Sequence, residues 1–200
     1  MDVTYPPEPW DLHGHSYVGL WLVPQHQAPS PHHAGTRQIR VLGRTIVLAT
    51  FVRYDEPSPL TYDEIMATQL VRDGWRPRVS ISHIWVDSPA SRDGGRALWA
   101  IPKDLAEFDR TTDESYCADG IADLRVGRVR MLPFDLPSRF KLAQDRDGTL
   151  VTSPVRVSAR MGVARAAWSF RADGPLSFLT GRRPLVTLAI RPFHMLFGRR

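Results

Sequence analysis

Residues 44–54, RTIVLATFVRY, form a strong strand candidate in this chain of 200 residues. β-Branched and aromatic side chains dominate the segment, and they suit the pleated, half-buried surface of a sheet. Pro57 and Pro59 follow it. Because proline lacks the backbone N–H that a sheet needs, these residues end the strand. The segment therefore predicts a buried strand with a sharp end.

Further strands are expected on both sides of this segment. Residues 79–86, VSISHIWV, alternate between apolar and polar side chains, which is the period of a strand. Turn signals at Asp147-Gly148 and Asp173-Gly174-Pro175 separate later candidates. About eight short strands with little helix predict a β-barrel or a sandwich in one domain, 1–200. The other candidates are 17–23, 120–130, 140–143, 151–160, 164–171 and 185–193.

Three segments need a separate interpretation. Thr61 with Glu64 three residues later matches a capping box, which begins a helix, yet residues 64–71 also alternate as a strand. Residues 87–95 have the composition of a turn. A short helix is expected near residues 103–108, directly after a proline.

Composition excludes several classes of protein. The net charge of +5 comes from arginines that form no basic run or helical stripe, so nucleic-acid binding is not expected. The apolar stretch at residues 17–23 is too short to span a bilayer, and we expect no membrane association. Cys117 is the single cysteine, and the N-terminus has no signal-peptide pattern, so a cytoplasmic location is predicted.

Two further kinds of site are not expected. His26, His32 and His33 lack the spacing of a zinc site, and no cofactor fingerprint is present. Asp87 with Ser88 and Ser91 imitates part of a nucleophilic triad. No Gly-x-Ser-x-Gly turn accompanies these residues, and His83 is the one base within reach along the chain.

Lys103 is the strongest candidate for chemistry. The chain has 26 lysines and arginines, but only Lys103 and Lys141 are lysines. Lys103 lies in the apolar segment 94–108, GGRALWAIPKDLAEF. Lysine can lose its proton and act as an amine nucleophile, whereas arginine cannot. The alternative is a charged lysine whose stem covers Trp99 and Phe108 while its amine stays in water.

The lysine segment resembles the central signature of the acetoacetate decarboxylase family. The resemblance rests on Val86-Asp87-Ser88, Gly95-Arg96 and Ile101-Pro102-Lys103. In that family a strand with a Gly-Arg-Glu-type sequence leads to an aromatic or aliphatic residue, a proline and the Schiff-base lysine. Weaker similarities extend along the chain, at residues 10–24, 44–52, 79–86, 148–160 and 173–176.

The resemblance implies a fold and a set of site residues. It implies a mostly antiparallel β-barrel cone with few short helices around an apolar cavity, with Lys103 as the nucleophile. Glu64 matches the active-site glutamate of the family, which favours a strand over a capped helix there. Arg96 is a candidate substrate anchor and Trp99 a candidate cavity wall.

This chain departs from the family pattern at two positions. Asp104 stands where the decarboxylase has a second lysine, and a nearby carboxylate would stabilise the ammonium form of Lys103. His15 stands where the decarboxylase has an arginine in the first strand, so His15 becomes a candidate substrate contact. Arg53 and Arg96 are possible substitutes for that arginine. The chain is also shorter than typical decarboxylases, which fits a divergent branch of the family.

These features predict a lyase that needs no metal or organic cofactor. Lys103 would form an iminium with a small keto acid or ketone, and Glu64 would move protons. Decarboxylation and aldol or dehydration chemistry both remain open. The alternative is a non-catalytic protein that binds a small molecule in the same cavity. The resemblance also implies a homo-oligomer.

Overall fold

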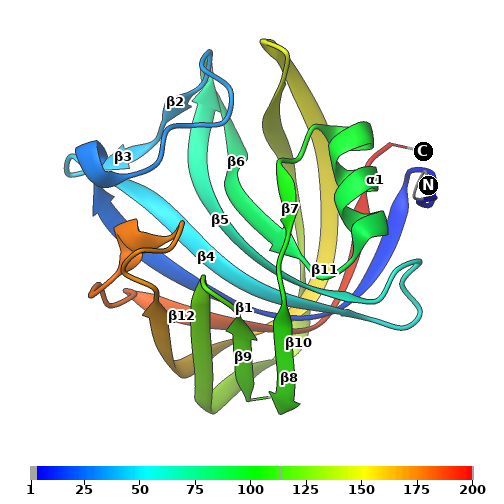
Figure 1. Cartoon of the computed structure of the whole chain (residues 1–200), viewed down its shortest axis with the longest axis vertical. Helices are drawn as coiled ribbons and strands as arrows, with labels where there is room; N and C mark the ends of the chain where they lie inside the picture. Colours follow the sequence, from blue (N-terminus) through cyan, green and yellow to red (C-terminus); the bar gives the residue numbers. More distant parts are fainter. Residues whose placement is uncertain (1–3, 113, 200) are drawn as a thin grey trace.

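The computed structural model describes residues 4–112 and 114–199 as one strongly curved, mostly antiparallel sheet with a single α-helix in the described part (Figure 1). The strand order is β7-β6-β5-β4-β1-β12-β11-β10-β9-β8, with β2 and β3 attached to β5 and β4. The elements are β1 (Trp10–Pro24), η1 (Gln25–Gln27), β2 (Arg37–Gln38), β3 (Arg40–Val41), β4 (Arg44–Asp55), β5 (Tyr62–Asp73), β6 (Arg76–Val86), α1 (Pro89–Trp99), β7 (Lys103–Leu105), β8 (Phe108–Thr112), β9 (Ser115–Ala118), β10 (Ala122–Arg146), β11 (Thr149–Phe170), η2 (Ser177–Leu179) and β12 (Val186–Phe197).

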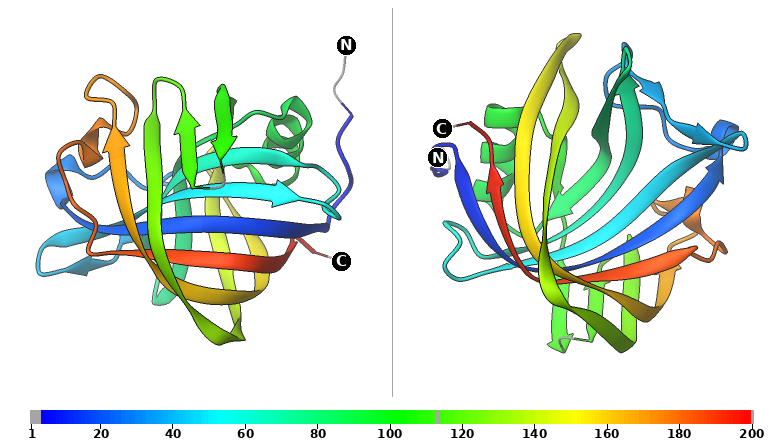
Figure 2. Two further views of the ribbon diagram at one scale, coloured as in Figure 1. Left: turned by 90° about the horizontal axis from the view of Figure 1, so that it is seen from below. Right: turned by 180° about the vertical axis from the view of Figure 1, so that it is seen from behind.

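The sheet curls until β10 meets β6, so that its central strands surround an interior (Figure 2). One parallel backbone pair, Leu142 with Val79, joins the two strands. The side chain of Gln144 adds two hydrogen bonds to the backbone of Ile81: Oε1 accepts from the N–H at 3.0 Å, and Nε2 donates to the carbonyl at 3.2 Å. A side-chain amide thus replaces part of a strand ladder where the sheet closes.

Two apolar clusters occupy the two faces of this sheet. Alternation along the strands divides the residues between them, as with Tyr17 in one cluster and Val18, which lines the interior cavity. The interior cluster includes Trp10, Ile84 and Trp99. The outer cluster is covered by β9, the first part of β10 and η2. The expected mainly β fold, with its curved sheet around an interior, is confirmed.

The long hairpin of β10 and β11 corrects the predicted strand boundaries. Residues 122–130 and 140–143 belong to one strand, β10, and residues 151–160 and 164–170 belong to another, β11. Pro133 and Pro137 lie between the first two segments on an exposed stretch, and a register shift between Met131 and Asp135 accommodates the first of them. Figure 1 shows the hairpin as the tallest element, and its turn is at the expected Asp147-Gly148, where both residues have positive φ.

The segment around the lysine was predicted wrongly in its secondary structure. Residues 87–95, expected as a turn, contain most of α1, and Gly95-Arg96, expected in a strand, lies within this helix. Residues 103–105, expected in a helix, form β7, which pairs in parallel with β6. The segment after Thr61 is a strand, as the family resemblance implied.

No helix in residues 4–112 and 114–199 has the length and apolar character needed to cross a membrane.

Candidate active site

Helix α1 and the turn after it bring Lys103 to the interior. The hydroxyl of Ser88 accepts a hydrogen bond from the N–H of Ser91, and Pro89 occupies the first turn, where its missing N–H costs nothing. Ala100 ends the helix in a left-handed conformation. The chain then turns back, and Lys103 enters β7 opposite Ile84.

Strand alternation separates Lys103 from Asp104. Lys103 is 4% exposed and points to the interior, whereas Asp104 is exposed on the opposite side. The guanidinium of Arg96 bonds to the Asp104 carboxylate and donates from Nε to the carbonyl of Lys103 at 2.6 Å. Asp104 therefore ties β7 to α1. Its carboxylate is engaged by Arg96, and the charge partner of the lysine amine is another residue.

The amine of Lys103 has three polar contacts inside the protein. Its Nζ lies 2.8 Å from Oε2 of Glu64, which is 2% exposed. It donates to the hydroxyl of Ser91 at 2.8 Å and to that of Tyr62 at 3.3 Å. The other carboxylate oxygen of Glu64 accepts a hydrogen bond from the hydroxyl of Tyr54 at 3.2 Å. These five side chains form one buried polar cluster.

Strand β5 places two members of the cluster by its period of two. Tyr62, Glu64, Met66 and Thr68 all face the interior, and Tyr54 stands opposite Tyr62 on β4. Lys103 and Glu64 were expected from the sequence, whereas Ser91 was discounted and the two tyrosines were not expected as site residues. The signal for Tyr62 was its position two residues before Glu64 in an alternating segment. Ser91 reaches the amine from α1, and Tyr54 reaches Glu64 from β4, so the packing of these elements brings both residues into the cluster.

The cluster holds Lys103 as an ammonium ion in the resting protein. Burial by itself lowers the pKa of this amine, but the charge and hydrogen bonds of Glu64 and Tyr62 outweigh burial, so the pKa is raised. Burial, with the nearby Glu64 carboxylate, raises the pKa of Tyr54 well above its usual value. The pKa of Tyr62 is also raised, chiefly by burial, against the opposing effect of Lys103.

These shifts predict a loss of stability at alkaline pH. A group whose pKa is raised by folding stabilises the protein fully below its unfolded pKa, which is about 10 for tyrosine and about 10.4 for lysine. The contribution is lost as the pH rises through the folded pKa. The free energy of unfolding should therefore be insensitive to these groups up to about pH 9 and fall above about pH 10. Urea unfolding between pH 7 and 11 measures this decline in the free energy of unfolding. If the cluster has no such effect, the triple variant Tyr54→Phe/Tyr62→Phe/Lys103→Met will show the same decline as the wild-type protein.

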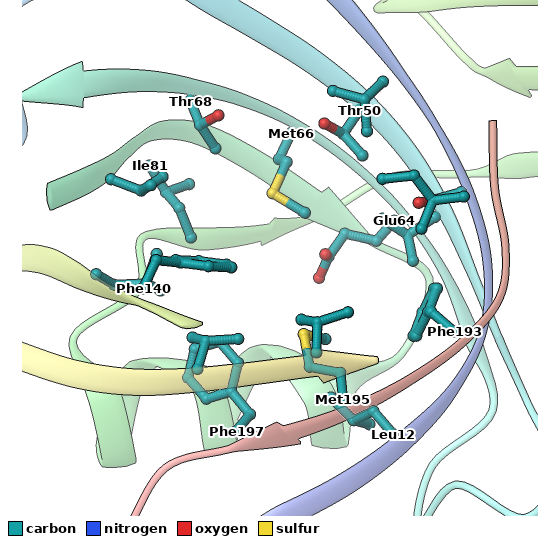
Figure 3. A pocket seen from close by; sticks show the side chains of 18 of the residues that line it. Leu12, Thr50, Glu64, Met66, Thr68, Ile81, Phe140, Phe193, Met195 and Phe197 are labelled. Atoms are coloured by element: carbon teal, nitrogen blue, oxygen red, sulfur yellow. The ribbon is translucent and has the colours of Figure 1, made fainter. Parts of the chain in front are cut away.

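A cavity of about 350 Å³ adjoins the polar cluster. Figure 3 shows Glu64 among apolar side chains of the lining, such as Met66, Phe140 and Met195. Lys103 and Glu64 are the charged residues among the described side chains that line it. An amine in such surroundings has the desolvated environment and the proton acceptor that a lysine nucleophile needs.

Gly95 leaves room for the lysine side chain. A Cβ at this position would lie 2.9 Å from Cδ and 3.0 Å from Cε of Lys103, closer than real contacts allow. Glycine inside a helix costs about 1 kcal/mol relative to alanine. The close approach explains why α1 contains a glycine at this turn.

Gly95→Ala should displace the amine of Lys103 from Glu64. The crowding should lower the free energy of unfolding by about 1–3 kcal/mol, measured by urea denaturation. In a Lys103→Ala background the same change removes the clash and should be neutral or stabilising by up to about 1 kcal/mol, through helix propensity. An equal cost in both backgrounds would contradict the steric explanation.

The other candidate site residues fall into two groups. Trp99 lines the cavity, packs against Trp10 and Phe197, and donates from Nε1 to Glu8 at 2.8 Å. His15, Arg53 and Arg96 are outside the lining.

Alternation explains the positions of His15 and Arg53. Arg53 lies between two cavity-lining residues of β4, so its side chain is on the other face, paired with Asp63 at 3.0 Å. His15 lies 3.0 Å from Asp55 on that face. The expected substrate contacts of His15, Arg53 and Arg96 therefore have no support from their positions.

A cluster of possible metal ligands lies elsewhere, on β1 and β12. Potential ligand atoms of Asp11, His13 and His194 are within 4.8 Å of one another, and these side chains are exposed or half-buried. The Asp11 carboxylate contacts both imidazoles, at 3.3 and 2.6 Å. His33, from the loop that sequence analysis considered, instead pairs with Asp145 at 2.6 Å.

Comparison with known protein families gives one match for this chain. The family model described as acetoacetate decarboxylase matches residues 37–161, which is more than half of the chain. This range includes β4 to β10 and therefore both Lys103 and Glu64. No curated protein matches.

Solved structures with the same fold cover nearly the whole chain. The acetoacetate decarboxylase of Legionella pneumophila has a TM-score of 0.70 at 16% identity, over 98% of this chain and 87% of that one. The enduracididine biosynthesis enzyme MppR, in complex with pyruvate, has a TM-score of 0.60 at 14% identity, over 96% and 89%. An acetoacetate decarboxylase-like enzyme from Sphingomonas wittichii RW1 has a TM-score of 0.55 at 15% identity, over 95% and 89%.

Proposed function

Since the chain belongs to the acetoacetate decarboxylase family, we propose that it is a Schiff-base-forming lyase whose nucleophile is the amine of Lys103. The substrate is a keto acid or a ketone, and no cofactor is required because the iminium itself accepts electrons. The observation that carries the proposal is the position of Lys103, buried beside an apolar cavity and 2.8 Å from a carboxylate.

The first step requires a neutral amine. The proton can pass from Nζ of Lys103 to Oε2 of Glu64 across 2.8 Å, which leaves the net charge of the cavity unchanged. A substrate that displaces water from the cavity favours this neutral pair, because desolvation disfavours charged groups. The raised pKa of the resting lysine is therefore compatible with reaction once substrate is bound.

Covalent chemistry then follows without any other protein group. The nitrogen attacks the carbonyl carbon, and the carbonyl oxygen leaves as water after taking up protons. In sum, one amine, one carbonyl compound and the proton held by Glu64 give one iminium ion, one water and a Glu64 carboxylate. That carboxylate can accept a proton from the carbon next to the iminium, or carbon dioxide can leave from the same position. Protonation of the enamine and hydrolysis by one water regenerate Lys103.

Trapping with borohydride tests the proposal directly. The protein is incubated with acetoacetate, pyruvate or acetone, reduced, digested and analysed by mass spectrometry. We expect one reduced adduct per chain on the peptide that contains Lys103. If none of these carbonyl compounds gives an adduct at any pH from 5 to 9, the enzyme proposal is refuted, because this range brackets the pKa that a catalytic amine needs.

The competing function is binding without catalysis. In that case Lys103 remains an ammonium ion paired with Glu64, and the cavity holds its ligand by apolar contacts alone. The buried ion pair between Nζ of Lys103 and Oε2 of Glu64, at 2.8 Å, is the observation that favours it. A carbonyl compound that binds with a measurable heat but gives no reduced adduct would identify this function.

We also propose that the protein forms a homo-oligomer. Leu132, Phe134 and Val163 are large apolar side chains exposed on β10 and β11, and Phe134 is 53% exposed. Exposed apolar side chains of this size suit contact with a second copy of the chain. Size-exclusion chromatography with light scattering should give an oligomer for the protein and a smaller species for Phe134→Arg. A wild-type monomer at micromolar concentration would contradict this.

A further inference from the structure

The cavity beside Lys103 is larger than a small keto acid requires. Its volume of about 350 Å³ corresponds to roughly a dozen liquid water molecules at about 30 Å³ each. Cavities of this size hold ligands considerably larger than pyruvate or acetoacetate. A compound as small as these would leave most of the cavity empty or wet.

The lining of the cavity extends along strand β5 away from the lysine cluster. Glu64, Met66 and Thr68 line it in succession on one face of that strand. At about 3.3 Å per residue, the distance from Glu64 to Thr68 is roughly 13 Å. This length accommodates an extended chain of roughly ten carbon atoms, whose bonds are each about 1.5 Å long and are shortened by the zigzag.

The wall of this extension is almost entirely apolar. Aliphatic, thioether and aromatic groups from β6, β10, β11 and β12 surround it, and the polar groups away from the cluster are hydroxyls. Burial of a hydrocarbon chain against such a surface is favourable, whereas a polar chain would find few hydrogen-bond partners there. The apolar lining includes Val79, Ile81, Leu136, Phe140, Leu142, Val155, Val157, Ile190, Met195 and Phe197.

The described lining also lacks a second cation that would pair with a substrate carboxylate. Lys103 and Glu64 are its charged residues and they neutralise each other. Arg53 and Arg96, the arginines considered for this task, lie outside and are paired with Asp63 and Asp104. A buried carboxylate without a cation is strongly disfavoured. A substrate carboxylate would also lie near the Glu64 carboxylate produced by iminium formation.

We propose that the substrate is a neutral ketone with a hydrocarbon chain of roughly six to ten carbon atoms, whose carbonyl group lies at Lys103 and whose chain lies along β5. This inference rests on the proposed function and narrows it: the enamine formed from a ketone reacts by proton transfer or carbon–carbon bond chemistry, because there is no carboxylate to lose.

Four compounds separate the effect of chain length from that of the carboxylate. Acetone and nonan-2-one differ by six methylenes, and pyruvate and 2-oxononanoate differ by the same six. Each keto acid equals its ketone with one methyl group replaced by a carboxylate. Dissociation constants are measured by calorimetry, and adducts at Lys103 are measured separately by borohydride trapping.

We expect nonan-2-one to bind at least about 100-fold more tightly than acetone, since each buried methylene is worth up to about four-fold. We expect 2-oxononanoate to bind no more tightly than nonan-2-one. A chain-length effect of less than about ten-fold, or a carboxylate that tightens binding in either pair, overturns the inference. An adduct with none of the four compounds rejects the proposed function, while the dissociation constants still decide the ligand class.

A variant at the far end of the cavity checks the binding position. Thr68→Phe should shorten the cavity and weaken the binding of nonan-2-one by about ten-fold or more, with little effect on the binding of acetone. The matched control is Arg72→Phe, because Arg72 lies on the same strand but is exposed and outside the lining. This variant should change neither dissociation constant. An equal effect of Thr68→Phe on both ketones would place the chain elsewhere.

Discussion

Lys103→Arg should abolish the borohydride-trapped adduct and lower turnover by at least about 1,000-fold, as expected for loss of a covalent nucleophile. Arginine keeps the positive charge beside Glu64, so the ion pair is retained. A guanidinium does not lose its proton in proteins and cannot attack a carbonyl carbon. Mass spectrometry after reduction and a steady-state assay on the identified ketone measure the two effects.

Lys141 provides a matched control, because it is the second of the two lysines in the sequence. It lies exposed on β10, and Lys141→Arg should leave both adduct and turnover unchanged. If the adduct persists in Lys103→Arg and disappears in Lys141→Arg, the nucleophile is Lys141 and the proposal is refuted.

Breaking the Lys103–Glu64 pair from either side should have the largest effect on stability. Lys103→Met leaves a buried carboxylate and Glu64→Met leaves a buried ammonium, each beside an apolar cavity. Removing one partner of a buried pair costs about 3–5 kcal/mol. The double variant contains two apolar side chains of suitable size and should recover most of this loss. Urea unfolding of all four proteins at pH 7 gives the coupling energy.

The pH dependence of the free energy of unfolding shows whether a single variant is destabilised by its unpaired charge or by altered packing. The isolated carboxylate in Lys103→Met can be neutralised by a proton, so this variant should regain stability as the pH falls from 7 to 5. The double variant has no such group and should not. If the double variant instead lost the sum of the two single costs, the pair would contribute nothing through its charges.

The strands around the site were predictable because local chemistry determines them. In β4, β-branched residues and terminal prolines give a short-range signal, and the structure places the strand at Arg44–Asp55. Helix α1 was missed because Pro89 and Gly94-Gly95 have turn-like composition. The segments 120–130 and 140–143 were expected as separate strands, whereas β10 continues through Pro133, which lies in a register shift, and Pro137, which is paired with Ser158. Whether a strand tolerates such prolines depends on the sheet around it.

The site was predictable only in part, for a similar reason. Lys103 and Glu64 were proposed from scarcity, apolar context and family resemblance. Tyr54, Ser91 and Gly95 act through contacts between two strands or between a helix and a strand, and no pattern within a single element reports such contacts. The expected effect of Asp104 on the amine of Lys103 depended on the directions of the two side chains. Neighbouring residues of a strand point to opposite faces, so the fold prevents the contact that their adjacency in the sequence suggested.

The closure between β6 and β10 has a consequence for the local stability of the cavity wall. The other ladders between neighbouring long strands of the wall each pair many residues, but here one backbone pair and the amide of Gln144 join the strands. Separating this seam breaks fewer hydrogen bonds than separating β1 from β4, which pair over twelve residues from His13 to Pro24. Local opening follows the lowest free-energy cost. Of these two junctions, the one between β6 and β10 therefore separates at the lower cost in backbone hydrogen bonds, and the amide of Gln144 carries part of that cost.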